Sequence, residues 1–261
     1  MKILAIGDIV GESGRDYLCA RLWAYRRAHD IDLVVANGEN VRMGEGNGID
    51  PASAEVLLAA GVDVLTGGNH TFRRSDYYAA LDDSRVLLRP ANYPSAAPGY
   101  GDTIVEAAGV RVLVMNVMGT MFLESLACPF ETVDKILARR AGEYDVAVLD
   151  VHAEATSEKA ALARYFDGRV QVVFGTHTHV QTNDACVLPQ GTGFLTDLGM
   201  TGPTESILGV DAAVIIEMMR SKLHKKFTLA TGKVEAQGAV FTVAVQNGVM
   251  ARTIIVENVK F

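Results

Sequence analysis

The chain has 261 residues, a formal net charge of −7 and 49% hydrophobic residues, which is enough apolar material for a sizeable core. The acidic balance argues against a protein whose main role is to bind nucleic-acid backbone, because such proteins carry a positive excess. The apolar content and the absence of long charge blocks exclude a disordered or fibrous chain.

The sequence carries no pattern typical of export, membrane insertion or disulfide bonding. The three cysteines are far apart and form no CxxC pair, which argues against a disulfide framework and a zinc finger. Asp8 interrupts the apolar start too early for a signal peptide, and no apolar run approaches the roughly 18 residues that cross a bilayer. We therefore expect a cytoplasmic protein with no membrane partner.

The first third of the chain alternates short apolar runs with helical patterns. Strands are predicted over residues 3–6, 33–36 and 62–65, and helices over 13–28 and 51–60, the second with Asp50 as N-cap and Pro51 at its first position. This alternation is typical of βαβ units around a buried parallel sheet.

The second half predicts more strands and fewer helices. Strands are expected over 103–107, 110–117, 145–151, 170–174, 239–246 and 249–256, and helices over 158–166 and 211–223. The dipeptide Asn247-Gly248 between the last two strands is a strong hairpin signal. No linker or repeat divides the chain, so we expect one α/β domain over residues 1–261, with two mixed sheets facing each other and helices outside.

Polar side chains follow each predicted parallel strand. They are Asp8 after the first, Glu39 and Asn40 after the second, Asn69 and His70 after the third, and then His152, His177 and His179. In open α/β sheets, ligands gather at the carboxyl ends of the strands. Four of the six histidines of the chain lie in these segments.

These residue types are metal ligands, because carboxylates carry charge and bridge cations while neutral imidazoles suit zinc, iron and nickel. In an extended His-x-His, both side chains point to one face, so His177 and His179 can each address one of two adjacent ions. Each residue alone has an ordinary interpretation, such as a helix cap, a turn or a core imidazole. Their occurrence together at successive strand ends predicts a metal site.

The same residues carry a resemblance to calcineurin-like metallophosphoesterases. The matching segments are Asp8, Gly67-Gly68-Asn69-His70, His152 and Gly175-Thr176-His177-Thr178-His179. The chain departs from that signature where Asp8-Ile9-Val10 lacks a histidine, where Gly38-Glu39-Asn40 replaces G-D-x-x-D, and where Gly175-Thr176-His177 replaces G-H. These departures resemble the YmdB-like bacterial phosphodiesterases, as do residues 89–94 and 197–203. The resemblance implies a four-layer α-β-β-α sandwich of two mixed sheets.

The resemblance also implies two adjacent transition-metal ions in each chain. One would be held by Asp8, Glu39, Asn40 and His179, and the other by Glu39, Asn69, His152 and His177, with Glu39 bridging. Iron is the metal expected, with manganese as the alternative, because the first set is rich in oxygen.

The activity implied is hydrolysis of small phosphodiesters, with 2′,3′-cyclic nucleotides suggested by the subfamily. A hydroxide bridging the two metals would attack phosphorus, and His70, beside the ligand Asn69, would act as general acid. For His70, a hydrogen bond to a ligand remains the other interpretation. Two further functions stay open: a phosphomonoesterase or nucleotidase, and a regulatory protein with a largely structural metal site.

Three segments have less specific interpretations, and no substrate-binding residue is identified. The glycine-rich loop 42–48 could line the substrate entrance or be a simple connection. Arg73 and Arg74 could contact a phosphate or be solvated. Residues 119–129 could be a lid or a contact in a homo-oligomer.

Overall fold

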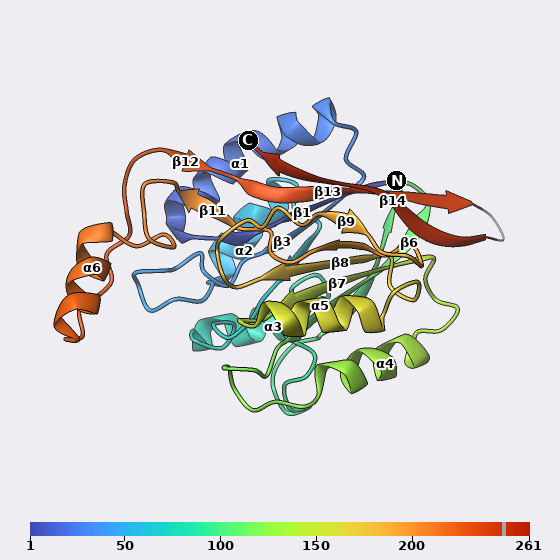
Figure 1. Ribbon diagram of the computed structural model, residues 1–261, viewed down its shortest axis with the longest axis horizontal. Coiled ribbons are helices and arrows are strands. Elements are labelled where there is room, and N and C mark those ends of the chain that lie inside the picture. The colour runs from blue at the N-terminus through green and yellow to red at the C-terminus, as the bar shows by residue number, and fades with distance from the viewer. Residues whose placement is uncertain (247–248) are drawn as a thin grey trace.

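Two large β-sheets pack face to face in the computed structural model, which describes residues 1–246 and 249–261, and helices cover the outer faces (Figure 1). The first sheet has the order β14-β13-β1-β3-β4 and the second has the order β5-β6-β7-β8-β10-β9. Both are mixed: in the first, the parallel strands β1, β3 and β4 continue into the antiparallel pair β13 and β14, and in the second, the parallel strands β6, β7, β8 and β10 are flanked by antiparallel β5 and β9. The predicted four-layer α-β-β-α sandwich of two mixed sheets is confirmed.

The elements have the following bounds. The first sheet holds β1 (Lys2–Ile6), β3 (Leu33–Asn37), β4 (Val64–Thr66), β13 (Gln237–Gln246) and β14 (Val249–Lys260). The second holds β5 (Asp102–Ala107), β6 (Val110–Met118), β7 (Val146–His152), β8 (Val172–Thr176), β9 (Cys186–Val187) and β10 (Gly193–Leu195). The helices are α1 (Gly11–Ala28), α2 (Pro51–Ala59), α3 (Tyr78–Asp83), α4 (Pro129–Arg139), α5 (Thr156–Tyr165) and α6 (Ala212–Ser221), with a 3₁₀ turn at Ser75–Tyr77.

Alternate residues of the central strands point into different apolar layers. In β1, Ile3 belongs to the cluster between the two sheets, whereas Leu4 belongs to the cluster beneath α1 and α2. In β7, Val148 faces the other sheet and Leu149 packs under α4 and α5. Because successive side chains of a strand point to opposite faces, a strand buried on both sides reads as an unbroken apolar run.

Several elements of the structure were not predicted from the sequence, among them α3, β9 and β10. A small third sheet, β2 (Asp8–Ile9), β11 (Met200–Pro203) and β12 (Val234–Glu235), was not predicted, because its strands are too short to show a period. Helix α4 was also missed, and it starts at Pro129, the last residue of the segment 119–129 interpreted as a lid or an oligomer contact. Strands β13 and β14 pair antiparallel as expected, while the predicted turn Asn247-Gly248 lies outside the described residues.

Helix α6 projects from the body of the molecule (Figure 1). Asp211 caps its N-terminus by accepting hydrogen bonds from two backbone amides, and of its residues only Ile215 is buried. Within residues 1–246 and 249–261, no helix combines the length and the apolar character that a membrane span requires.

A buried ion pair fixes the loops that follow β8 and β10. Lys159 on α5 is fully buried, and its Nζ lies 2.7 Å from Oδ2 of Asp197. Asp197 also accepts hydrogen bonds from the amides of Thr178, at 3.2 Å, and Gly199, at 2.9 Å. The carboxylate thus holds the backbone between the two predicted histidine ligands His177 and His179.

We expect Lys159→Met to lower the free energy of unfolding by about 3–5 kcal/mol, because it leaves the buried Asp197 carboxylate without its cation. Urea unfolding measures this value. Lys135→Met is the matched control, since the Lys135 side chain is 76% exposed and its loss is expected to change stability by less than about 0.5 kcal/mol. Equal stabilities of the two variants would contradict a structural role for the pair.

Candidate metal centre

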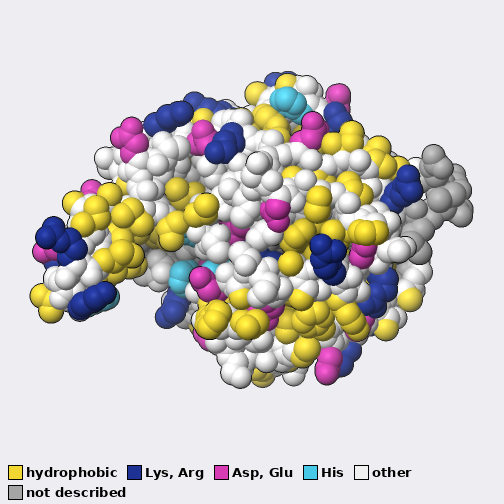
Figure 2. Space-filling model, viewed as in Figure 1, with side chains coloured by type: hydrophobic (Ala, Val, Ile, Leu, Met, Phe, Trp, Pro, Cys, Tyr) yellow, Lys and Arg dark blue, Asp and Glu magenta, His cyan; other side chains and the backbone are white. Residues whose placement is uncertain are grey.

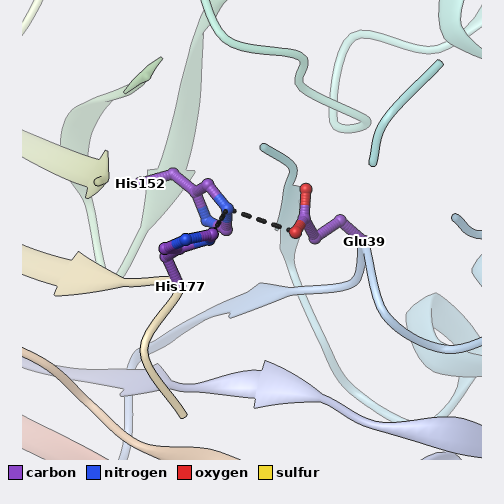
Figure 3. Close-up of side chains that lie close together, drawn as sticks. All are labelled: Glu39, His152 and His177. Carbon is purple, nitrogen blue, oxygen red and sulfur yellow. Dashed lines mark hydrogen bonds and ion pairs between the residues drawn. The ribbon is translucent and has the colours of Figure 1, made fainter. Parts of the chain in front are cut away.

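Three ligand-type side chains meet where β3, β7 and β8 end (Figure 3). The ligand atoms of Glu39, His152 and His177 all lie within 4.8 Å of one another. His152 Nε2 is 3.1 Å from Glu39 Oε1 and 3.1 Å from His177 Nδ1. Parallel strands from both sheets end at this site, and the sequence predicts polar side chains at these strand ends.

Glu39, His152 and His177 form a first group of ligand-type side chains, and Asn69, from the segment after β4, belongs to it too. Its Oδ1 lies 2.9 Å from His152 Nε2. The preceding residue is Gly68, where a Cβ would lie only 2.2 Å from Cδ2 of His152. A side chain at position 68 would therefore displace the imidazole, so glycine is required for the close approach.

A second group forms around Asp8, Asn40 and His179. Asn40 Nδ2 lies 3.1 Å from His179 Nε2, and 3.3 Å from both Asp8 Oδ1 and Glu39 Oε1. His179 Nε2 is 3.7 Å from Asp8 Oδ1. Glu39 contacts members of both groups, through His152 on one side and Asn40 on the other.

The amide of Asn40 has its nitrogen toward the cluster and its oxygen toward His70. Asn40 Oδ1 lies 2.8 Å from His70 Nδ1. The nitrogen and oxygen of a side-chain amide exchange places on a rotation of 180° and are assigned from the hydrogen-bond network. To act as an oxygen ligand, Asn40 must adopt the rotated orientation.

Hydrogen bonds outside the cluster determine where the His152 ring carries its proton. Thr176 Oγ1 donates to Asp150 Oδ1 at 2.8 Å, so its oxygen is free to accept the Nδ1 proton of His152 at 2.9 Å. His152 Nε2 then presents a lone pair to the cluster. Such outer partners commonly orient metal-binding histidines.

Asp150 and Thr176 were not identified from the sequence as partners of the site, although the sequence pattern around Asp150 could have indicated its role. It is the single charged residue in the apolar run of β7 and is fully buried. Burial raises the pKa of Asp150 to about 6, although His152 and the hydroxyls of Thr66 and Thr176 oppose this change. A carboxylate in that position needs partners, and hydroxyl groups from two neighbouring strands supply them.

The other two histidines are oriented in the same manner. His179 Nδ1 lies 3.1 Å from the carbonyl oxygen of Leu208, which can only accept, so Nε2 faces Asp8 as a lone pair. His177 Nε2 lies 3.0 Å from Glu154 Oε2, which leaves Nδ1 to face His152. The outer hydrogen bonds therefore turn acceptor atoms, not donors, toward the centre.

This arrangement fits a cation. In the first group, two ring nitrogens and a carboxylate oxygen converge within 4.8 Å as lone pairs, and like-signed atoms repel unless a positive charge lies among them. Carboxylate, amide and imidazole groups together suit first-row transition metals. The residues present therefore have the chemistry that a metal site requires.

Without a cation, a proton shared by His152 and Glu39 supplies the positive charge among these acceptor atoms. Burial disfavours a charged His152, but the Glu39 carboxylate outweighs it and raises the pKa of His152 to about 9. Burial also disfavours the Glu39 carboxylate, yet His152 and His70 hold the pKa of Glu39 well below its usual range. Burial and the charge on His152 together lower the pKa of His177 to about 4. A bound metal would replace the shared proton.

The expectation that His177 and His179 lie on an extended strand is wrong. Strand β8 ends at Thr176, and both histidines have a positive φ, 100° at His177 and 63° at His179. His177 and His179 still contact different groups, because the turn directs the His177 ring toward His152 and the His179 ring toward Asn40. Positive φ costs a non-glycine residue of order 1–3 kcal/mol, and such strain is typical of functional sites.

His70 lies beside the cluster rather than within it. Its amide donates to Glu39 Oε2 at 2.8 Å, and its Nδ1 lies 3.3 Å from Glu39 Oε1. Its Nε2 faces outward, 3.2 Å from Nδ2 of Asn47. Asn47 belongs to the glycine-rich loop 42–48, so this loop reaches the site and does not only connect elements. All eight site residues expected from the sequence are thus brought together.

A cavity of about 450 Å³ adjoins this outer side and is lined by Asn47, Arg73, Lys225 and Lys226, among others. Arg73 therefore faces a space next to His70, whereas Arg74 pairs with Asp76 at 2.9 Å. Figure 2 shows histidine side chains in a hollow of the surface, between the body and the part that contains α6.

Known proteins resemble this chain over almost its whole length. The family model of YmdB-like proteins matches residues 4–255. A 2′,3′-cyclic-nucleotide 2′-phosphodiesterase of Bacillus subtilis (strain 168) is 42% identical over 243 residues, which are 93% of this chain and 91% of that protein.

Solved structures show the same relationship. A hypothetical protein from Thermus thermophilus superposes with a TM-score of 0.90 at 37% identity, over 100% of this chain and 99% of the other. A structure described as a novel phosphatase from Mycoplasma pneumoniae has a TM-score of 0.91 at 28% identity, over 100% and 93% of the two chains. A 5′-nucleotidase precursor of T. thermophilus shares the fold, with a TM-score of 0.61 at 14% identity over 100% and 54%. The chain therefore belongs to the YmdB-like family.

Proposed function

We propose that the chain is a metal-dependent phosphoric diester hydrolase that acts on small phosphodiesters, and on 2′,3′-cyclic nucleotides in particular. The observation that carries this proposal is the convergence of two imidazole nitrogens, those of His152 and His177, with the buried Glu39 carboxylate within 4.8 Å. The B. subtilis relative, named a 2′,3′-cyclic-nucleotide 2′-phosphodiesterase, supports the choice of substrate class.

The proposed centre holds two transition-metal ions. Asp8, Asn40 and His179 would bind one with Glu39, and Asn69, His152 and His177 would bind the other with Glu39. Two bound cations would supply a nucleophile at neutral pH and would neutralise charge on the phosphoryl oxygens. The oxygen-rich first set favours iron or manganese over zinc.

His70 is the proposed proton donor, and Nε2 is the atom that donates. Asn40 and Glu39 bind the Nδ1 side and the backbone amide of His70, which fixes the ring at the edge of the cluster. Its Nε2 faces the outer loop rather than a ligand. With the Asn40 amide rotated to bind a metal through its oxygen, its nitrogen would donate to Nδ1, and a proton at Nε2 could then reach the oxygen that leaves phosphorus.

We expect Glu39→Gln to lower metal content in both positions, because the shared carboxylate loses its charge toward each cation. Elemental analysis of purified protein is expected to find about two ions per wild-type chain and fewer than one in the variant. Glu131→Gln is the control, since Glu131 lies on α4 and its side chain is 71% exposed. Unchanged metal content in Glu39→Gln would remove Glu39 from the ligand set.

We expect His70→Ala to keep its metal and to lose turnover by roughly 10²–10⁴-fold on a diester with a poor leaving group, because protonation of the leaving oxygen is lost. A nitrophenyl ester is expected to show a much smaller loss, since its leaving group needs little protonation. His29→Ala is the control, because His29 lies outside the site and stacks on Tyr25. Equal losses on both esters would argue for a positioning role instead.

Substrate choice is tested by comparing kcat/KM for 2′,3′-cyclic nucleotides, 3′,5′-cyclic nucleotides and nucleoside monophosphates on the metal-loaded protein. We expect the 2′,3′-cyclic class to react fastest, because its strained five-membered ring is released on opening. Long RNA is expected to bind weakly, since the chain carries a net charge of −7. A clear preference for monoesters would favour a phosphatase, the activity named for the M. pneumoniae structure.

A further inference from the structure

A cavity of about 590 Å³ lies between helix α4 and the segment that follows β4, outside the two ligand groups. Its lining includes five cationic side chains, those of Arg85, Arg89, Lys135, Arg139 and Arg140, and the carboxylate of Asp102. We call it the arginine pocket. Such a local excess of positive charge is unexpected in a chain with a net charge of −7.

The carboxylate in the pocket is already bound. Arg139 donates to Asp102 Oδ1, and Arg140 Nε donates to Asp102 Oδ2 at 2.9 Å. Both oxygens of Asp102 therefore have arginine partners. Lys135 pairs with Glu131 at 3.4 Å, so Arg85 and Arg89 are the cations of the pocket that have no carboxylate partner among the described residues.

Arg89 is the residue that most requires a further partner. It is only 7% exposed, and within the described part of the chain its guanidinium makes one hydrogen bond, from Nη1 to the carbonyl of Pro90 at 2.8 Å. Its buried Nε has no partner among those residues. Burial lowers the pKa of Arg89, with Asp102 acting in the opposite direction. A buried cation without an anion is unfavourable, so a bound anion would stabilise it.

The pocket suits a phosphate ester better than a bare anion. Guanidinium groups bind phosphate oxygens in pairs, which favours phosphate wherever several arginines converge. Tyr93 and Tyr100 also line the cavity, and the guanidinium of Arg85 lies 3.5 Å from the centre of the Tyr100 ring. The volume is in the range of small-molecule sites and leaves room for an organic group.

We propose that the arginine pocket binds the phosphate group of a small phosphate ester, at a site separate from the metal centre. Its wall reaches toward that centre, because Tyr93 packs edge-to-face on Phe72 with ring centres 5.0 Å apart, and Phe72 is two residues from His70. The Tyr93–Phe72 contact therefore connects the wall of the arginine pocket to the segment that carries His70.

The test counts phosphate sites by equilibrium dialysis with labelled inorganic phosphate and with AMP, and adenosine serves as the probe that lacks phosphate. Metal-loaded wild-type protein is expected to bind two phosphates per chain, because the metal centre also attracts phosphate. His152→Gln is expected to keep the arginine-pocket site. Arg89→Met is expected to keep only the metal-dependent site, with Kd at the arginine pocket raised at least about tenfold.

Two further variants make the result decisive. Arg139→Gln keeps Asp102 bound through Arg140, and the Arg139 side chain is 59% exposed, so it is expected to fold normally and to weaken phosphate binding. Arg111→Met, whose arginine pairs with Asp145 away from the pocket, is expected to bind as wild type does.

Thermal unfolding of ligand-free protein distinguishes a ligand-binding role of Arg89 from a purely structural role. Arg89→Met is expected to keep or raise Tm, because it removes an unpaired buried cation, whereas a purely structural arginine would lower it. Stronger binding of AMP than of phosphate, with no binding of adenosine, would identify an ester as the ligand. Loss of all phosphate binding in His152→Gln, or wild-type binding in both Arg89→Met and Arg139→Gln, would overturn the proposal.

Discussion

The structure of the candidate site depends on one buried carboxylate, that of Glu39. It lies between two groups of side chains and contacts both, through His152 on one side and Asn40 on the other. A buried negative charge is unfavourable unless positive charge or hydrogen-bond donors surround it. The imidazoles, the amide of His70 and, in our proposal, two metal ions serve this purpose. The four-layer fold is what brings these groups to Glu39.

Hydrogen bonds and an ion pair around the site keep acceptor atoms directed at the Glu39 carboxylate and at one another. Thr176, Glu154 and the carbonyl of Leu208 accept the outer protons of the imidazoles, and Asp150 in turn accepts from the Thr176 hydroxyl. The Lys159–Asp197 pair holds the loop that carries His177 and His179. The positive φ of both histidines is maintained by this framework. The fold therefore supports an arrangement that is locally unfavourable in the metal-free chain, as is typical of functional sites.

Much of the site could be predicted from the sequence because the βαβ pattern has a geometric consequence. Apolar runs with intervening helices imply a parallel sheet, and parallel strands end at one edge, so residues such as Asp8, Glu39 and Asn69 could be expected to meet before any contact was known. His152 ends β7 in the other sheet, so its place beside them depends on how the two sheets pack. The resemblance divided the site residues into two groups that share Glu39, and in the structure Glu39 Oε1 lies 3.1 Å from His152 Nε2 and 3.3 Å from Asn40 Nδ2. The fold class could be predicted for the same reason, since each core strand alternates between two apolar layers.

The tertiary structure alone decided features that depend on partners far apart in the chain. The proton position on His152 depends on Thr176 and Asp150, and the conformation of His177 depends on the turn after β8 rather than on an extended strand. The arginine pocket joins residues 85–102 to 132–140, and nothing in either segment predicts the other. The sequence by itself determined which chemical groups stand at the strand ends, because periodicity and strand direction are local properties. Protonation, backbone strain and cavities depend on non-local contacts, so they became visible only in the folded chain.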